Sequence, residues 1–119
     1  MNGRKTYDLE DRTLKFAKQV WEFSRQIPRT LENIEYCKQL IRSSSSIGAN
    51  YIEANEALGK KDFAMRIRIC KKESKETRYW LNLLICPDHS VNRRNELIQE
   101  STELMKIFGA IIEKVKVKD

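Results

Sequence analysis

The chain has 119 residues, of which 40% are hydrophobic and 34% charged, and its formal net charge is +6. This length and balance predict one folded domain over residues 1–119 and exclude a disordered chain. No apolar run approaches the roughly 20 residues that cross a bilayer, and the first eight residues are polar. We therefore expect a cytoplasmic protein with no membrane partner.

Pro28, Gly59 and Pro87 divide the sequence into four segments of similar length. Each segment carries apolar residues at alternating spacings of three and four, which predicts a helix with one buried face. No segment shows the period of two that a half-buried strand requires. We expect helices at about residues 8–27, 31–58, 61–85 and 91–116.

The first segment begins at Asp8, a favourable N-cap residue. Its core row is Leu9, Thr13, Phe16, Val20, Phe23 and Ile27. The second segment contains serines at positions 43–46, which resemble a loop by composition, but its core row runs through them. That row is Cys37, Leu40, Ser44, Ile47, Tyr51, Ala54 and Leu58. Gly59 is expected to end this helix as a left-handed cap.

The last two segments repeat the pattern. Their core rows are Phe63, Ile67, Cys70, Ser74, Thr77, Leu81 and Leu84, and then Leu97, Ser101, Leu104, Phe108, Ile111 and Val115. Serines in core rows, and glycines at 48 and 109 inside helices, predict close helix approach, with Ser44 and Ser74 bonded to the carbonyl four residues earlier. Four such helices with short loops predict an all-α, antiparallel up-down-up-down four-helix bundle.

Two further rows lie outside the core rows of the second and third helices. The first is polar, and the second places carboxylates beside a tryptophan. Such rows are either solvated faces or contact surfaces, and the tryptophan among charges favours contact. We therefore expect an oligomer interface at Gln39, Arg42, Ser46, Asn50, Glu53, Glu73, Glu76 and Trp80. Within it, Arg42 is expected to pair with Glu73 or Glu76 across a helix or subunit boundary.

Most of the positive charge is local. Residues 60–78 contain eight basic and three acidic residues, a local excess of five positive charges. One outward arc, which we call the basic ridge, comprises Arg68, Lys71, Lys72, Lys75 and Arg78, with Tyr79 beside it. The ridge is either a solubilising face or a surface that contacts the phosphates of RNA or DNA. In an oligomer it would be repeated, which strengthens binding.

The residue types that carry catalysis are sparse. The sequence has one histidine, His89, and no glycine-rich phosphate loop. Cys86 and His89 have a metal-like spacing, but no second ligand pair accompanies them. Cys37, Cys70 and Cys86 are an odd number and are expected to be reduced thiols. We expect no enzyme activity, no metal and no cofactor.

Two blocks of the sequence resemble a known family. The first is Gln39-Leu40-x-Arg42-Ser43-Ser44-x-Ser46-Ile47-x-x-Asn50-x-x-Glu53, and the second combines Lys61-Asp62-Phe63 with Glu73-Ser74-x-Glu76-Thr77-x-Tyr79-Trp80-Leu81. Together they resemble the bacterial four-helix-bundle proteins encoded in intervening sequences of 23S ribosomal RNA genes. The match covers nearly the whole chain. Many relatives have Glu-Gly where this chain has Glu53-Ala54, which changes only a packing position.

The resemblance implies a left-turning antiparallel bundle that assembles as a ring, with a homopentamer favoured. The family is similar in fold to the accessory protein of diversity-generating retroelements, which binds nucleic acid, and its motif supplies no catalytic residue. We therefore predict a non-enzymatic, ring-forming protein that binds RNA or DNA, ribosomal RNA included, through the basic ridge. The alternative is a protein-interaction scaffold with no nucleic-acid ligand.

Overall fold

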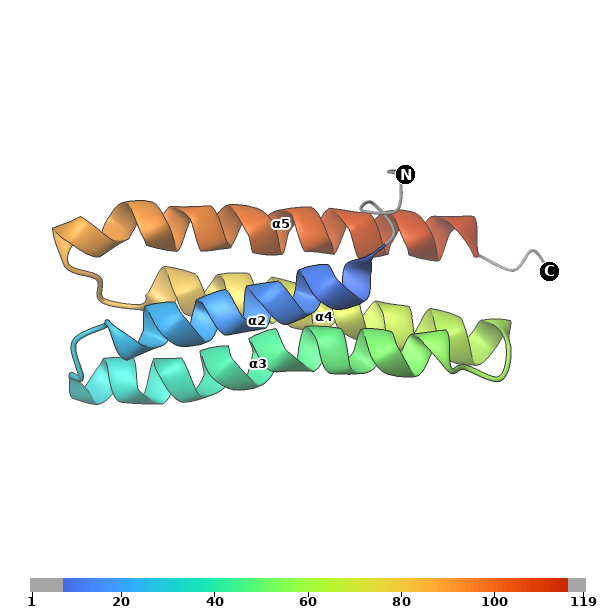
Figure 1. Cartoon of the computed structure of the whole chain (residues 1–119), viewed down its shortest axis with the longest axis horizontal. Helices are drawn as coiled ribbons and strands as arrows, with labels where there is room; N and C mark the ends of the chain where they lie inside the picture. The colour runs from blue at the N-terminus through green and yellow to red at the C-terminus, as the bar shows by residue number, and fades with distance from the viewer. Residues whose placement is uncertain (1–7, 116–119) are drawn as a thin grey trace.

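A computed structural model of the chain describes residues 8–115, and these residues form four α-helices and no strand (Figure 1). The helices are α2 (Leu9–Arg25), α3 (Leu31–Asn55), α4 (Lys60–Leu83) and α5 (Val91–Lys114), and a 3-10 turn, η1 (Asp88–Ser90), precedes α5. The all-helical prediction is confirmed. Helix ends differ from the expected ones by no more than three residues, and the expected end at residue 116 lies outside the described range.

The four helices lie side by side along the long axis of a molecule that measures 49 × 32 × 20 Å (Figure 1). The α2–α3 and α4–α5 connections lie at one end and the α3–α4 connection at the other. Helix α3 packs on α4, α4 on α5 and α2 on α3, whereas α2 and α5 touch over a smaller area. None of the described helices combines the length and the apolarity that crossing a membrane demands.

The core rows expected from the sequence are buried over most of their length. Every member of the α2 row is buried, and so are the α3 row at Leu40, Ser44, Ile47 and Ala54 and the α4 row from Ile67 to Leu84. The core rows become more exposed to solvent near the helix ends, where Phe63, Ile111 and Val115 are half-buried. The serine-rich stretch is continuous α-helix, as its place in the α3 row predicts.

The connection between α3 and α4 departs from the expectation. Helix α3 ends at Asn55, and Leu58 is 98% exposed, so its assignment to the core row is wrong. Gly59 has an extended backbone with φ of 175° and precedes α4, so it is not a left-handed cap of α3. Instead, the Asp62 carboxylate at the start of α4 accepts a hydrogen bond from the Leu58 N–H at 3.4 Å. The residues that follow α3 therefore serve the turn into α4.

The small residues have different roles. A Cβ on Gly48 would lie 2.8 Å from Thr13 Oγ1, so α2 and α3 approach closely there, as expected. A Cβ on Gly109 would meet nothing nearer than Lys71 Nζ at 3.7 Å, so close approach does not explain that glycine. The Ser74 hydroxyl donates to the Cys70 carbonyl four residues earlier, as predicted, whereas the Ser44 hydroxyl donates to Ile41, three residues earlier.

Candidate functional site

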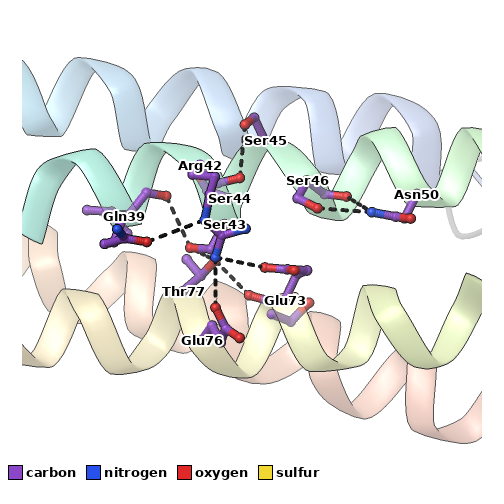
Figure 2. Close-up of polar contacts among 12 residues, drawn as sticks. Gln39, Arg42, Ser43, Ser44, Ser45, Ser46, Asn50, Glu73, Glu76 and Thr77 are labelled. Atoms are coloured by element: carbon purple, nitrogen blue, oxygen red, sulfur yellow. Dashed lines mark hydrogen bonds and ion pairs between the residues drawn. The ribbon is translucent and has the colours of Figure 1, made fainter.

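One side of the serine-rich centre of α3 faces α4, and side chains from the two helices form a polar seam there (Figure 2). At its buried side, the Thr77 hydroxyl donates to Ser43 Oγ at 2.9 Å. The Ser43 hydroxyl in turn donates to the Leu40 carbonyl at 3.2 Å. Both side chains are wholly buried, and their hydrogen bonds offset the cost of removing them from water.

Arg42 bridges the outer side of the seam (Figure 2). Its Nη2 lies 2.8 Å from Glu76 Oε1 and 3.6 Å from Glu73 Oε1, and its Nε donates to Gln39 Oε1 at 3.4 Å. The predicted pairing of Arg42 with these carboxylates is therefore present, across a helix boundary within one chain. Glu73 is the buried member, with a side chain only 8% exposed, and its Oε1 accepts no hydrogen bond from the described residues.

The same seam continues in both directions. The Asn50 amide donates to the carbonyl and the hydroxyl of Ser46 at 2.9 Å, and its oxygen accepts from Arg66 of α4 at 3.1 Å. At the other end, the ring of Trp80 lies 6.3 Å from that of Tyr36 on α3 and 5.2 Å from that of Tyr79. The seam therefore has hydrogen bonds in the middle and aromatic contacts at one end.

The predicted interface residues thus lie largely along this intrachain seam. Periodicity places them beside the core row, and the neighbouring helix of the same chain occupies that position. Glu53 lies apart from the seam, near the C-terminal end of α3, where it is exposed. A contact between subunits at these residues stays a prediction.

The basic ridge lies on the exposed arc of α4. Arg68, Lys71, Lys72 and Lys75 are exposed, and Arg78 is half-buried, with Nη1 3.4 Å from Thr102 Oγ1 of α5. None of the five ridge cations forms an ion pair with a carboxylate of residues 8–115. The ridge therefore presents charges that the described part of the protein does not neutralise.

Several cations on the other three helices are paired, whereas Lys15, Lys18 and Lys106 form no ion pair among the described residues. Arg12 of α2 makes a two-pronged bond to Glu100 of α5, at 2.7 and 2.9 Å, and reaches Glu103 at 2.9 Å. These hydrogen bonds, the one to Glu100 above all, raise the pKa of Arg12. Three more ion pairs are exposed and join residues three positions apart in one helix. They are Arg25–Glu22, Lys38–Glu35 and Arg93–Glu96.

A groove on the outer side of α2 and α3 was not assigned from the sequence. It contains a cavity of about 170 Å³ whose lining includes Trp21, Cys37 and Ile41. Trp21 is 50% exposed, and Leu14 one heptad earlier is 53% exposed. The sequence pattern that could have indicated this groove is the spacing of seven residues between Leu14 and Trp21 and between Ile34 and Ile41.

The three cysteines are free thiols. Burial raises the pKa of Cys70 to about 12 and also raises the pKa values of Cys37 and Cys86, so the reactive thiolate is disfavoured at each. Among the described residues, no three side chains of the metal-ligating types gather in one place.

The chain is similar to known proteins in both its sequence and its fold. The profile of the 23S rRNA-intervening sequence protein family matches residues 5–110. The chain belongs to this family. The resemblance inferred from the two sequence blocks is therefore confirmed. No protein with a curated description matches this family member.

A solved relative supports the same assignment. The crystal structure of a protein of unknown function from the S23 ribosomal protein family of Bacteroides thetaiotaomicron is 33% identical in sequence. The alignment covers 87% of this chain and 96% of that chain, with a TM-score of 0.75. This chain therefore shares the fold of that relative over most of its length.

Proposed function

We propose that this protein is a non-catalytic, oligomeric nucleic-acid-binding protein that contacts the phosphates of RNA or DNA through the basic ridge of α4. The observation that carries the proposal is the clustering of unpaired cations, because five of them lie within residues 68–78 of a single helix. Arg12, Arg25, Lys38, Arg42 and Arg93 have carboxylate partners, whereas the ridge cations have none among the described residues. Unpaired cations keep their full attraction for phosphate and release counterions when they bind it.

The placement of the ridge suits a polyanion. From Arg68 to Arg78 the helix rises about 15 Å, at about 1.5 Å per residue, so the charges follow a line rather than a point. Lys71 and Arg78 lean toward α5, where Lys71 Nζ lies near Gly109 and Arg78 near Thr102. The remaining three side chains extend from the exposed arc. A linear array of this kind fits successive phosphates and carries no base specificity by itself.

The name of the family refers to 23S ribosomal RNA, and the solved relative is described as a member of a ribosomal protein family. The family name refers to where the genes lie and does not choose between RNA and DNA, so ribosomal RNA is the first ligand to test and DNA the second.

Assembly is the second part of the proposal. We infer an antiparallel up-down-up-down bundle that forms a closed ring, with five copies favoured by the family resemblance. Support comes from exposed apolar side chains on α2 and α3, because Leu14, Trp21 and Ile52 are each at least 50% exposed and Trp21 also lines the cavity. Exposed apolar groups that share one face favour burial against another surface. A ring would repeat the basic ridge in each copy and raise the affinity for a long nucleic acid.

A protein-interaction scaffold is the competing function, and the cavity of about 170 Å³ in the α2–α3 groove favours it. Such a scaffold would bind its partner through Trp21 and its apolar neighbours. The charge of the ridge would then be incidental to function.

A pair of charge-matched variants tests the nucleic-acid proposal. Lys72→Gln with Lys75→Gln removes two ridge charges, and Lys15→Gln with Lys18→Gln removes two exposed charges from α2. Fluorescence anisotropy with a labelled RNA at low salt should show a loss of affinity of about ten-fold or more for the ridge variant and less than about two-fold for the α2 variant. Equal losses of affinity in the two variants, or no RNA binding by the wild type, would contradict the nucleic-acid proposal and favour the protein-interaction scaffold.

A further inference from the structure

An aromatic side chain continues the basic ridge. Arg68, Lys72, Lys75 and Tyr79 follow one another at spacings of four, three and four residues, so they share one face of α4. Tyr79 is 58% exposed, and the three cations are exposed as well. This face, which we call the ridge stripe, is about 17 Å long at a rise of about 1.5 Å per residue.

Tyr79 is held in place from behind. Its ring meets that of Trp80 in a T-shaped contact, with the centroids 5.2 Å apart and the planes at 75°. Trp80 in turn lies 6.3 Å from Tyr36 of α3, so three rings link the stripe to the polar seam. Edge-to-face contacts of this kind stabilise a ring orientation. The exposed part of Tyr79 is therefore positioned before any ligand arrives, which lowers the entropy lost on binding.

We infer from this arrangement that the ridge stripe binds an unpaired segment of RNA, with a base stacked on Tyr79 and the preceding or following phosphates on Lys75, Lys72 and Arg68. The inference rests on the proposed function and adds the class of ligand. Cations beside an exposed aromatic ring are the combination that single-stranded nucleic acids require, because each base offers a flat face and each linkage a charge.

A duplex fits the ridge stripe less well. Its phosphates can contact the lysines, but its bases are stacked on one another and offer no free face to a side chain on a convex helix. Tyr79 would then contribute nothing to the affinity. The tyrosine therefore separates the two ligand classes, while the lysines do not.

The test compares two RNAs and three variants of the full chain. The RNAs are a labelled oligouridine and a blunt duplex of equal length, measured by fluorescence anisotropy over a range of salt concentrations. Tyr79→Leu removes the ring, and Tyr79→Phe keeps it. Leu58→Ala removes an apolar side chain that is 98% exposed, in the α3–α4 connection at the end of the bundle away from Tyr79, as the control. Circular dichroism and native mass verify the fold and the assembly of each variant.

Tyr79→Leu is expected to weaken binding of the oligouridine by about 5-fold to 150-fold and to leave duplex binding within about two-fold. Because the tyrosine carries no charge, the slope of affinity against salt should not change. Tyr79→Phe and Leu58→Ala should bind like the wild type. Equal wild-type affinity for both RNAs, or oligouridine binding that Tyr79→Leu does not weaken, overturns this inference alone. Failure of the wild type to bind either RNA overturns the proposed function as well.

Discussion

Replacing Gly48 by alanine should destabilise the protein, whereas the same change at Gly109 should stabilise it, although both glycines lie inside helices. A Cβ at Gly48 would lie 2.8 Å from Thr13 Oγ1 and 3.3 Å from Thr13 Cβ. Thr13 is wholly buried, and its hydroxyl donates to the Leu9 carbonyl at 2.7 Å. Thr13 therefore has no free space into which to turn, and α2 must move away from α3.

The magnitudes follow from two opposing effects. Alanine gains about 1 kcal/mol over glycine in a helix interior, while overpacking a tight contact costs about 1–3 kcal/mol. Gly48→Ala should therefore lower the free energy of unfolding by up to about 2 kcal/mol. At Gly109 the nearest atom is the flexible end of Lys71 at 3.7 Å, so the helix gain of about 0.5–1 kcal/mol should remain.

Urea unfolding followed by circular dichroism measures both variants. Thr13→Ala supplies a further control, because it removes the hydroxyl that the new methyl group meets. In a double-mutant cycle, Gly48→Ala should cost less in the Thr13→Ala background than in the wild type. The close approach of α2 and α3 would be refuted if Gly48→Ala stabilised the protein as much as Gly109→Ala.

Three further predictions concern the charged and thiol groups. Arg42→Ala leaves a buried carboxylate without its cation and should lower the free energy of unfolding by about 1–2 kcal/mol in urea titrations, less than for a fully buried pair because the arginine is half exposed. Cys70, with a pKa of about 12, should resist alkylation in mildly alkaline buffer until urea unfolds the chain. Hydrogen bonds from Gln99 and Arg12 lower the pKa of Glu103, so its stabilising contribution is present above the unfolded pKa and lost as the pH falls through the folded pKa. Unfolding measured against pH should therefore show an acid loss of stability that is smaller in Arg12→Gln.

Each of these three predictions would be contradicted by a specific result. Arg93→Ala, which breaks the exposed pair with Glu96, should change stability by less than about 0.5 kcal/mol, and an equal effect at Arg42 would contradict a structural role for the seam. Rapid alkylation of Cys70 in the native state would contradict its burial. An acid profile identical in wild type and Arg12→Gln would show that the α2–α5 bridge does not depend on the ionised Glu103.

The sequence predicted the helices and their buried faces well because each face follows a single period. Every residue of the α2 core row was predicted correctly. The prediction that Leu58 is buried was wrong, because a spacing rule continues past the residue where the helix ends. The prediction that Gly59 is a left-handed cap was wrong for a related reason. Glycine is common in left-handed caps, but it also serves an extended backbone at a helix start, and the residue type does not separate these uses.

The seam and the groove show what periodicity leaves open. A row beside the core faces the neighbouring helix of the same chain or another molecule, and the pattern alone does not say which. Arg42 was correctly paired with Glu73 and Glu76 from charge and position, but the burial of Glu73 depends on how closely α3 and α4 approach. The α2–α3 cavity depends on the relative tilt of two helices, which no single residue encodes.

The most direct test of phosphate binding by the ridge is the slope of log affinity for RNA against log salt concentration, measured for the wild type and for a variant in which Lys72 and Lys75 are glutamine. We predict a steep negative slope for the wild type. The slope of the variant should be shallower by nearly one for each phosphate that it no longer neutralises. A wild-type slope near zero, or slopes that coincide, would contradict phosphate binding by the ridge.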